Sequence, residues 1–174
     1  CALSTDATIT CWGESWYSNS DGQTDAPTGQ YTAITAGDDH SCALRTDATI
    51  TCWGNNNYGQ TDAPTGQYTA ITASYRHSCA LRTDATITCW GDNQSGETDA
   101  PTGQYTAIAA GGLHSCALRT DATITCWGSN GLGQTDAPTG QYTAITAGRG
   151  HSCALRTDGA VTCWGSESTH LPAW

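Results

Sequence analysis

Apolar and polar residues alternate along short stretches of the chain, and the alternation predicts strands. In the second repeat, the run Ser-Cys-Ala-Leu-Arg at 41–45 and the run Thr-Ile-Thr-Cys-Trp at 49–53 flank the polar turn Thr46-Asp47-Ala48. Two alternating runs around a short turn predict a β-hairpin. The stretch Tyr68–Ala73 predicts a third strand, which pairs with the first strand of the next hairpin. No stretch has helical periodicity, so the chain is expected to be all-β.

The length of the turn determines the register of this hairpin. A three-residue loop pairs Arg45 with Thr49, Leu44 with Ile50, and Cys42 with Cys52. Its third position requires a left-handed backbone, and the last copy has Gly159 there. Directly opposed residues lie roughly 4.5–5.5 Å apart, which is within the Cα range of a disulfide. The register therefore predicts a disulfide across the hairpin.

The ten cysteines fall into five identical Cys-x9-Cys pairs. An even number at one spacing indicates a disulfide framework and an oxidising compartment. Zinc sites usually need more closely spaced pairs, so zinc is a poor alternative. The expected disulfides are Cys1–Cys11, Cys42–Cys52, Cys79–Cys89, Cys116–Cys126 and Cys153–Cys163.

The hairpins belong to a tandem repeat marked by Cys-Trp-Gly at 11–13, 52–54, 89–91, 126–128 and 163–165. The spacing is 37 residues from the second copy on, and the first copy has four extra residues. A period of this size is typical of a solenoid or a propeller. The expected organisation is a single domain with the units 1–41, 42–78, 79–115, 116–152 and 153–174.

Each hairpin carries apolar groups on both faces, which favours a propeller. Cys42 and Leu44 fall on one face, and Ala43 and Trp53 on the other. Such a sheet is sandwiched between neighbours, as a propeller blade is. We therefore predict a β-propeller of about five short three-stranded blades. For the third strand of the first blade, Ser168–Trp174 is the sole candidate, and Pro172 makes it a poor one. We therefore expect the first blade to be either incomplete or completed by a neighbouring molecule.

The repeat resembles the regulator-of-chromosome-condensation repeat. His-Ser-Cys-Ala-Leu-Arg-Thr-Asp, followed by Cys-Trp-Gly and Gly-Gln, matches that family's Gly-x-x-His-Ser-x-Ala-Leu … Asp-Gly … Trp-Gly-x-Asn-x-x-Gly-Gln pattern over almost the whole chain. The resemblance implies a β-propeller, often seven-bladed. The family includes a nuclear exchange factor for a small GTPase and a secreted bacterial propeller that inhibits β-lactamases. The short units, paired cysteines and acidic charge are more similar to the secreted branch.

Two stretches of each repeat differ between copies, and the strand directions bring both to the same end of a blade. Loops on a rigid scaffold usually carry recognition, and Tyr, Ser, Asn and Gly there resemble the chemistry of a paratope. The alternative is that these residues are ordinary turn formers. The loop 14–21, lengthened by the four extra residues, is the first candidate. The candidate ligand-binding residues are Trp16, Tyr17, Asn19, Asp38, Asp39, Asn56, Tyr58, Tyr75, Arg76, Asn93, Leu113, Asn130, Leu132 and Arg149.

Composition and charge exclude some classes of binding partner. The chain has no lysine, six arginines and sixteen carboxylates, for a net charge of −10, which disfavours nucleic acid. No run reaches about 18 apolar residues, so membrane insertion is not expected. The absence of an initiator Met and a leader suggests a processed product. Together with the cysteines, this predicts a secreted, extracellular or cell-surface location.

The remaining chemical motifs predict no cofactor or metal. The histidines at 40, 77, 114 and 151 could form a metal-binding ring, but a framework role with hydrogen bonds to backbone is expected. The aspartate of Thr-Asp-Ala-Pro lacks the pattern of a calcium loop. Asn93-Gln94-Ser95 is a formal glycosylation sequon. Ser, His and Asp recur in every copy, whereas an active site needs one asymmetric constellation, so an enzyme is not expected.

Two functions follow from these observations. The first is a secreted, non-catalytic recognition module that binds a protein or a glycan through variable loops on one propeller face. The alternative is an extracellular structural protein that self-associates into filaments or a lattice, with a neighbour's strand completing the first blade.

Overall fold

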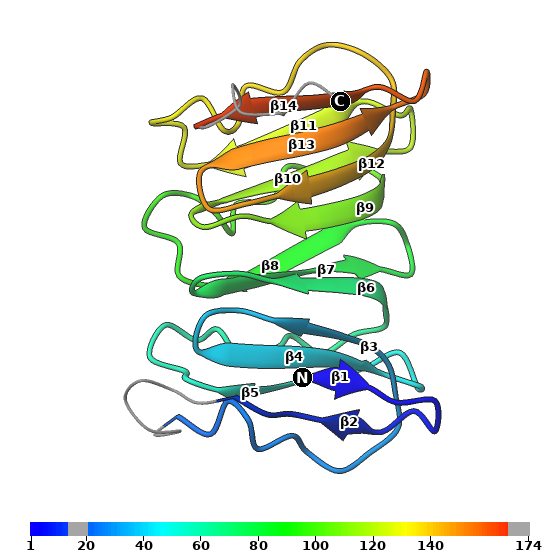
Figure 1. Ribbon diagram of the computed structural model, residues 1–174, viewed down its shortest axis with the longest axis vertical. Helices are drawn as coiled ribbons and strands as arrows, with labels where there is room; N and C mark the ends of the chain where they lie inside the picture. The colour runs from blue at the N-terminus through cyan, green and yellow to red at the C-terminus, as the bar shows by residue number, and fades with distance from the viewer. Residues whose placement is uncertain (14–20, 167–174) are drawn as a thin grey trace.

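The strands form five small antiparallel sheets in the computed structural model, which describes residues 1–13 and 21–166 (Figure 1). No helix occurs within these ranges, and the strands have the following bounds: β1 Ala2–Leu3, β2 Ile9–Thr10, β3 Tyr31–Ala36, β4 His40–Arg45, β5 Ile50–Gly54, β6 Tyr68–Ala73, β7 His77–Arg82, β8 Ile87–Gly91, β9 Tyr105–Ala110, β10 His114–Arg119, β11 Ile124–Gly128, β12 Tyr142–Ala147, β13 His151–Arg156 and β14 Val161–Gly165.

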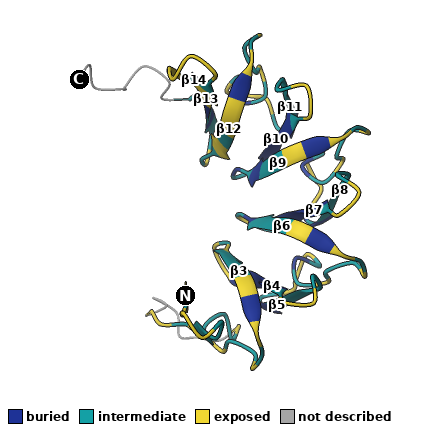
Figure 2. Ribbon diagram, turned by 90° about the vertical axis from the view of Figure 1, so that its right-hand side faces the viewer, coloured by how far each residue is buried: buried dark blue, intermediate teal, exposed yellow. Residues whose placement is uncertain are grey.

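Four of the sheets have three strands, in the orders β3-β4-β5, β6-β7-β8, β9-β10-β11 and β12-β13-β14. The first sheet pairs β1 with β2, and these are its two strands in the described part of the chain. The candidate strand at 168–174 lies outside that part. The sheets fan out along an arc, and the tips of β3, β6, β9 and β12 point toward its hollow side (Figure 2). The predicted all-β propeller architecture with repeated short blades is confirmed.

The predicted hairpin register is confirmed. Leu44 pairs with Ile50 and Cys42 with Cys52, and the same pairs recur in the other three complete sheets. The third turn position is left-handed, with φ of 66° at Ala48 and 88° at Gly159. The aspartate of each turn holds this geometry, since Asp47 Oδ1 accepts the Thr49 N–H at 3.0 Å and the Thr49 hydroxyl at 2.6 Å.

All five predicted disulfides are present. They join Cys1 to Cys11, Cys42 to Cys52, Cys79 to Cys89, Cys116 to Cys126 and Cys153 to Cys163. Their Cα atoms lie between 3.8 and 4.0 Å apart, somewhat closer than the roughly 4.5–5.5 Å expected for directly opposed residues. In the four three-stranded sheets the bond links the middle strand to the outer strand, and the described residues contain no free cysteine.

The core lies between sheets rather than within one. Cys42 and Leu44 on one face of the second sheet pack against Tyr68, Ala80 and Trp90 of the next. The same arrangement recurs at the following two interfaces. On the opposite face, Ala43 and Trp53 pack with Leu3, Ile9 and Cys11 of the first sheet. The predicted sandwiching of each hairpin is therefore correct, and it fixes the position of every turn relative to its neighbours.

Replacing Cys79 and Cys89 together by alanine should lower the free energy of unfolding. Loss of the 10-residue cross-link costs about 2–3 kcal/mol through the entropy of the unfolded chain, and Cys79 is fully buried, so its removal also leaves a cavity. Urea denaturation measures the change. The matched control removes Cys1 and Cys11, whose positions are more exposed; its effect should be smaller, and an equal or larger effect would contradict this account.

Candidate recognition surface

Wherever the structure describes them, the two variable stretches of a repeat lie at one end of the sheets, on the left in Figure 1. The Asn55 N–H donates to the Asp39 carbonyl at 2.8 Å and so joins them. Equivalent bonds link Asp92 to Arg76, Ser129 to Leu113 and Ser166 to Gly150. We refer to this side as the variable end. It comprises the inner turns 37–39, 74–76, 111–113 and 148–150 and the outer loops 55–58, 92–95 and 129–132. The opposite, framework end carries the Arg-Thr-Asp turns.

Successive inner turns are packed directly on one another. A Cβ atom added at Gly37 would lie 2.1 Å from the Ser74 carbonyl oxygen, and one at Gly111 would lie 2.6 Å from the Gly148 oxygen. The Gly112 N–H also donates to the Gly148 carbonyl at 3.2 Å. Absence of a side chain at these glycines lets the turns approach closely, so the side chains between them are brought to one place.

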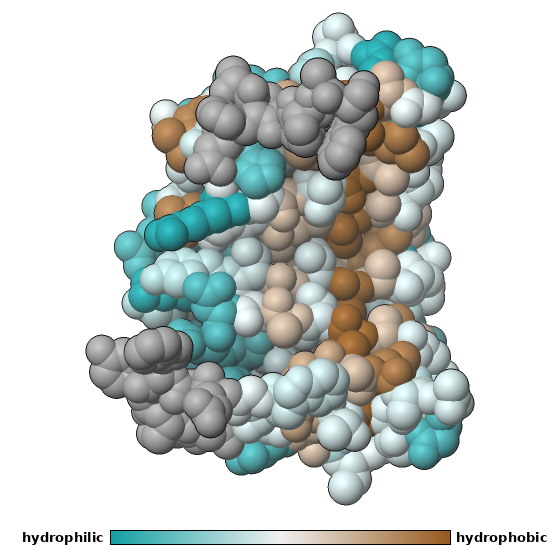
Figure 3. Space-filling view, viewed as in Figure 1, coloured by the Kyte–Doolittle hydropathy of each residue, from teal (hydrophilic) through white to brown (hydrophobic). Residues whose placement is uncertain are grey.

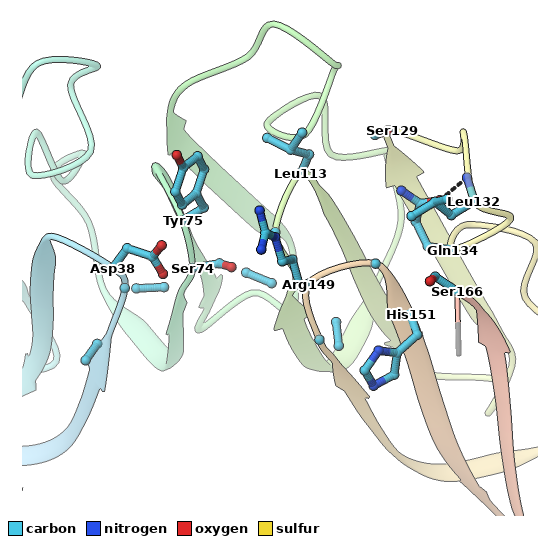
Figure 4. A pocket seen from close by; sticks show the side chains of 18 residues that line it. Asp38, Ser74, Tyr75, Leu113, Ser129, Leu132, Gln134, Arg149, His151 and Ser166 are labelled. Carbon is cyan, nitrogen blue, oxygen red and sulfur yellow. Dashed lines mark hydrogen bonds between the residues drawn. The ribbon is translucent and has the colours of Figure 1, made fainter. Parts of the chain in front are cut away.

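The inner turns line a pocket of about 860 Å³. Figure 4 shows Asp38, Tyr75, Leu113 and Arg149 around it, with Leu132 at one side. These are five of the residues that the sequence predicts for ligand binding, and they come from four different sheets. Figure 3 shows that the surface at the variable end is largely hydrophilic, whereas the apolar column lies toward the opposite side.

Two further candidates, Tyr58 and Arg76, form a cluster with Tyr75 beside the pocket. The Arg76 guanidinium lies 4.5 Å from the ring centres of both Tyr58 and Tyr75. Each tyrosine remains about 37% exposed. Stacking between two rings stabilises the position of the guanidinium while leaving its edge open to solvent. Asp39 lies in the neighbouring inner turn, exposed but not on the pocket wall.

The asparagine candidates are different, because their side chains hold the outer loops together. Asn56 Nδ2 donates to Asp62 Oδ1 at 2.9 Å, and its Oδ1 accepts the Thr61 N–H at 2.9 Å. Asn93 and Asn130 make the same two bonds. These contacts support the turn-forming interpretation for all three. Trp16, Tyr17 and Asn19 lie outside the described residues.

The histidines join adjacent sheets. His40 Nε2 lies 2.8 Å from the Ser78 hydroxyl of the next sheet, and His77 and His114 contact Ser115 and Ser152 in the same way. The expected partner was backbone at the start of the histidine's own strand, so that expectation is wrong. Among the described residues, no group of three or more His, Cys, Asp or Glu side chains could hold a metal ion.

Burial of these imidazoles disfavours their charged form. It lowers the pKa of His40, His77 and His114 to about 4. Neighbouring histidines lower the pKa of His77 and His114 further, and Asp92 partly offsets this for His77. The three rings are therefore neutral at pH 7 and serve as hydrogen-bonding links between sheets.

Glu97 is an irregularity that comparison of the repeats reveals. Gln60 Oε1 accepts the Tyr58 N–H, and its Nε2 donates to Asn55 Oδ1 at 2.9 Å. In the next copy Glu97 Oε2 accepts the Ser95 N–H at 2.7 Å, but its Oε1 has no hydrogen-bond partner and the side chain is fully buried. The position equivalent to Asn55 is Asp92, which is also an acceptor.

Several pocket residues were missed by the sequence interpretation. Ala36, Ala73, Ala110 and Ala147 end the inner strands, and His151 and Gln134 come from the repeated framework. The sequence prediction selects positions that differ between copies of the repeat, and these residues are nearly the same in every copy. The signal available was position: each alanine directly precedes an inner turn.

The chain is similar to known repeat proteins. The model of the "Regulator of chromosome condensation (RCC1) repeat" matches residues 31–60, 68–97, 105–134 and 142–170. No curated protein matches the chain significantly. Within the described residues, no helix is long and apolar enough to span a membrane.

Three solved structures illustrate the similarity. The ectodomain of the receptor kinase CR4 from Physcomitrella patens is 33% identical, with a TM-score of 0.69, covering 79% of this chain and 41% of that one. The ectodomain of the receptor kinase ACR4 from Arabidopsis thaliana is 28% identical, with a TM-score of 0.75, covering 93% and 62%. Prp20p from Saccharomyces cerevisiae is 18% identical, with a TM-score of 0.71, covering 80% and 46%. The chain thus spans between 41% and 62% of these proteins.

Acidification from pH 7 to pH 4.5 should lower the free energy of unfolding. The pKa of the three buried histidines is about 4 in the folded state and about 6.5 in the unfolded chain, so in this interval the unfolded chain binds more protons. The turn aspartates, whose pKa lies below 3.8, lose their contribution only at lower pH. Urea denaturation across the interval measures the slope. His77→Gln should reduce it by roughly a third, and a flat profile for the unaltered protein would refute the role of the histidines.

Glu97→Gln should stabilise the protein by about 1–2 kcal/mol, because the new amide can donate to Asp92 where Glu97 Oε1 is unpaired. The reciprocal change, Gln60→Glu, removes the donor to Asn55 and should destabilise the protein by a similar amount. Thermal and urea unfolding of both variants measure the effect. The two substitutions should change the free energy of unfolding in opposite directions. A change in the same direction for both would show that the hydrogen bond between residues 60 and 55, or 97 and 92, does not control loop stability.

Proposed function

The chain belongs to the family of proteins built from the regulator of chromosome condensation (RCC1) repeat, and from this we propose that it is a non-catalytic recognition module. Its variable end binds a partner protein, and the framework end together with the sheet interfaces holds that surface in place. The observation that carries the proposal is the convergence of Asp38, Tyr75, Leu113 and Arg149, from four sheets, on one pocket.

The exposed apolar groups support this choice of surface. Seven large hydrophobic side chains are exposed in the described part of the chain. Four of them, Tyr58, Tyr75, Leu113 and Leu132, belong to the variable end. Aromatic and arginine side chains are the residue types that most often dominate the binding energy of protein interfaces. On a surface that is otherwise hydrophilic, they offer a protein partner anchors of the right kind.

A protein is favoured over a glycan as the partner. Prp20p is described with binding to Gsp1p and histones, and yeast RCC1 with bound Kap60; at 18% identity these proteins share the fold with this chain. The receptor-kinase relatives are ectodomains. Five disulfides fit the same oxidising environment. We therefore place the recognition event outside the cell. Trp16 and Tyr17 stay among the proposed contacts on sequence grounds.

The serine–histidine pairs do not suit catalysis. Ser78, Ser115 and Ser152 are each completely buried between sheets. A nucleophilic hydroxyl must reach the substrate, and these hydroxyls bond the imidazole of the preceding sheet instead. The same pair occurs at three interfaces, as a structural link does. The proposed role therefore requires binding and no chemical step.

Capture experiments with three forms of the chain test the proposal. In the first variant, Ser74→Gly, Tyr75→Gly and Arg76→Leu convert one inner turn to the sequence of residues 111–113, which this scaffold already accommodates. The control, Ala48→Gly, gives a framework turn the sequence of residues 157–159. Each form is immobilised and exposed to a mixture of extracellular proteins, and bound proteins are quantified by mass spectrometry.

A partner should be captured by the unaltered chain and the control, and at least about tenfold less by the inner-turn variant, because the loss of one interface anchor typically costs more than 1.4 kcal/mol. Circular dichroism verifies that both variants are folded. Equal capture by all three forms would exclude the variable end as the binding surface. Light scattering of the same samples reports self-association, the alternative function.

A further inference from the structure

The arginines of this chain divide into two groups with different environments. The protein has six arginines and no lysine. Four of them, at positions 45, 82, 119 and 156, lie at the framework end, each 5.2–5.7 Å from the ring centre of a tyrosine. Arg45 Nε also donates to Thr51 Oγ1 at 2.7 Å, and Arg156 pairs with Asp158. These four guanidinium groups serve the scaffold.

The other two arginines both lie at the variable end. Arg76 is stacked between two tyrosines. Arg149 is exposed and lines the pocket. Its guanidinium makes no hydrogen bond or ion pair with any other described residue; the ion pair found among the described residues joins Arg156 to Asp158 at the framework end. In a chain of net charge −10, an arginine without a carboxylate partner is available to an anionic group of a ligand.

Arg149 is one member of a row. The four inner turns carry Asp38, Tyr75, Gly112 and Arg149 at the equivalent, middle position of the repeat. Each residue comes from the next sheet along the arc, so the row runs from a carboxylate, past a phenol and a glycine, to a guanidinium. In Figure 4 the Arg149 side chain extends back toward Tyr75 and Leu113, and Asp38 lies at the opposite side of the pocket.

We propose that this pocket binds a protein segment with a basic side chain placed at Asp38 and an acidic side chain placed at Arg149. An apolar side chain between them contacts Tyr75 and Leu113. The inference rests on the proposed function and adds the chemistry of the partner. Both charged residues are exposed, so each can pair with the ligand without rearrangement of the fold.

A singly charged carboxylate suits the site better than a phosphate. One guanidinium binds one carboxylate through two parallel hydrogen bonds. A phosphate group carries a charge near −2, and Asp38 on the same pocket would repel it. Tyr75, Leu113 and Leu132 add exposed apolar surface, which an inorganic or nucleotide phosphate would leave uncovered. The combination selects a peptide segment with charges of opposite sign.

Three end-blocked synthetic peptides serve as probes: Lys-Ser-Leu-Ser-Glu, Lys-Ser-Leu-Ser-Lys and Glu-Ser-Leu-Ser-Glu. Each is titrated into isotope-labelled protein, and amide chemical shifts report the binding site and the affinity. The unaltered protein should prefer the Lys/Glu peptide by about fivefold over the other two, as expected for one ion pair in a partly exposed site. Higher salt should reduce this preference.

Two variants with one altered charge test the assignment of each end. Arg149→Glu should shift the preference to the Lys/Lys peptide, and Asp38→Lys should shift it to the Glu/Glu peptide. Thr120→Lys, an exposed position in a turn of the framework end, is the control for an added charge and should leave the preference unchanged. The proposal would be overturned if every variant ranked the peptides in the same order. It would also be overturned if the peptides changed amide chemical shifts only at the framework end.

The outcome separates this proposal from the proposed function. If the inner-turn variant loses its protein partner while the peptides show no charge preference, the variable end is a recognition surface but the charged row does not select its ligand. If the peptides follow the predicted charges while no protein is captured, the pocket chemistry stands and the recognition of a folded extracellular protein is wrong.

Discussion

Packing of each sheet against the next is the interaction on which the rest of the structure depends. A three-stranded sheet of this size has no core of its own, because its apolar side chains point to both faces. Leu44 is buried by the following sheet and Trp53 by the preceding one. The Trp53 indole N–H donates to the Gln23 carbonyl at 3.0 Å, and the three later tryptophans make the same bond. Stability is therefore a property of neighbouring pairs, as in other repeat proteins.

Because packing between sheets holds the backbone in place, the side chains at the two ends of the molecule have different roles. At the framework end, an aspartate closes each hairpin turn and an arginine stacks on a tyrosine, so these charged side chains are engaged within the scaffold. At the variable end, the interfaces already fix the inner turns, and the turn side chains are not needed to hold them. Asp38, Tyr75 and Arg149 can differ in size and charge because the backbone beneath them is held by glycine contacts and by the His–Ser bonds. Variation is tolerated where the scaffold does not use the side chain.

The sequence was sufficient for the hairpins but not for contacts between sheets. Alternation and the Cys-x9-Cys spacing constrain the same register, so Cys42 opposite Cys52 could be predicted from either. The partner of His40 is 38 residues away, in the next sheet, and a local pattern does not reveal it. The bulge between Tyr68 and Ala70 was equally hidden, since alternation alone implies an unbroken register. Within the outer loops, the Asn56 position was grouped with its variable neighbours, although asparagine recurs there as Asn93 and Asn130 in the next two copies.

The pocket itself required three-dimensional placement, for a physical reason. Each sheet contributes one side chain from the middle of its inner turn, and no copy contains more than a quarter of the row formed by Asp38, Tyr75, Gly112 and Arg149. Taken singly, an aspartate or an arginine in a turn is ordinary. The row exists only because the arc brings successive turns into contact. The chain has sixteen carboxylates, and the Arg149 guanidinium pairs with none of the described ones, because the scaffold keeps it apart from them. Such separation leaves its hydrogen-bonding capacity for a molecule that comes from outside.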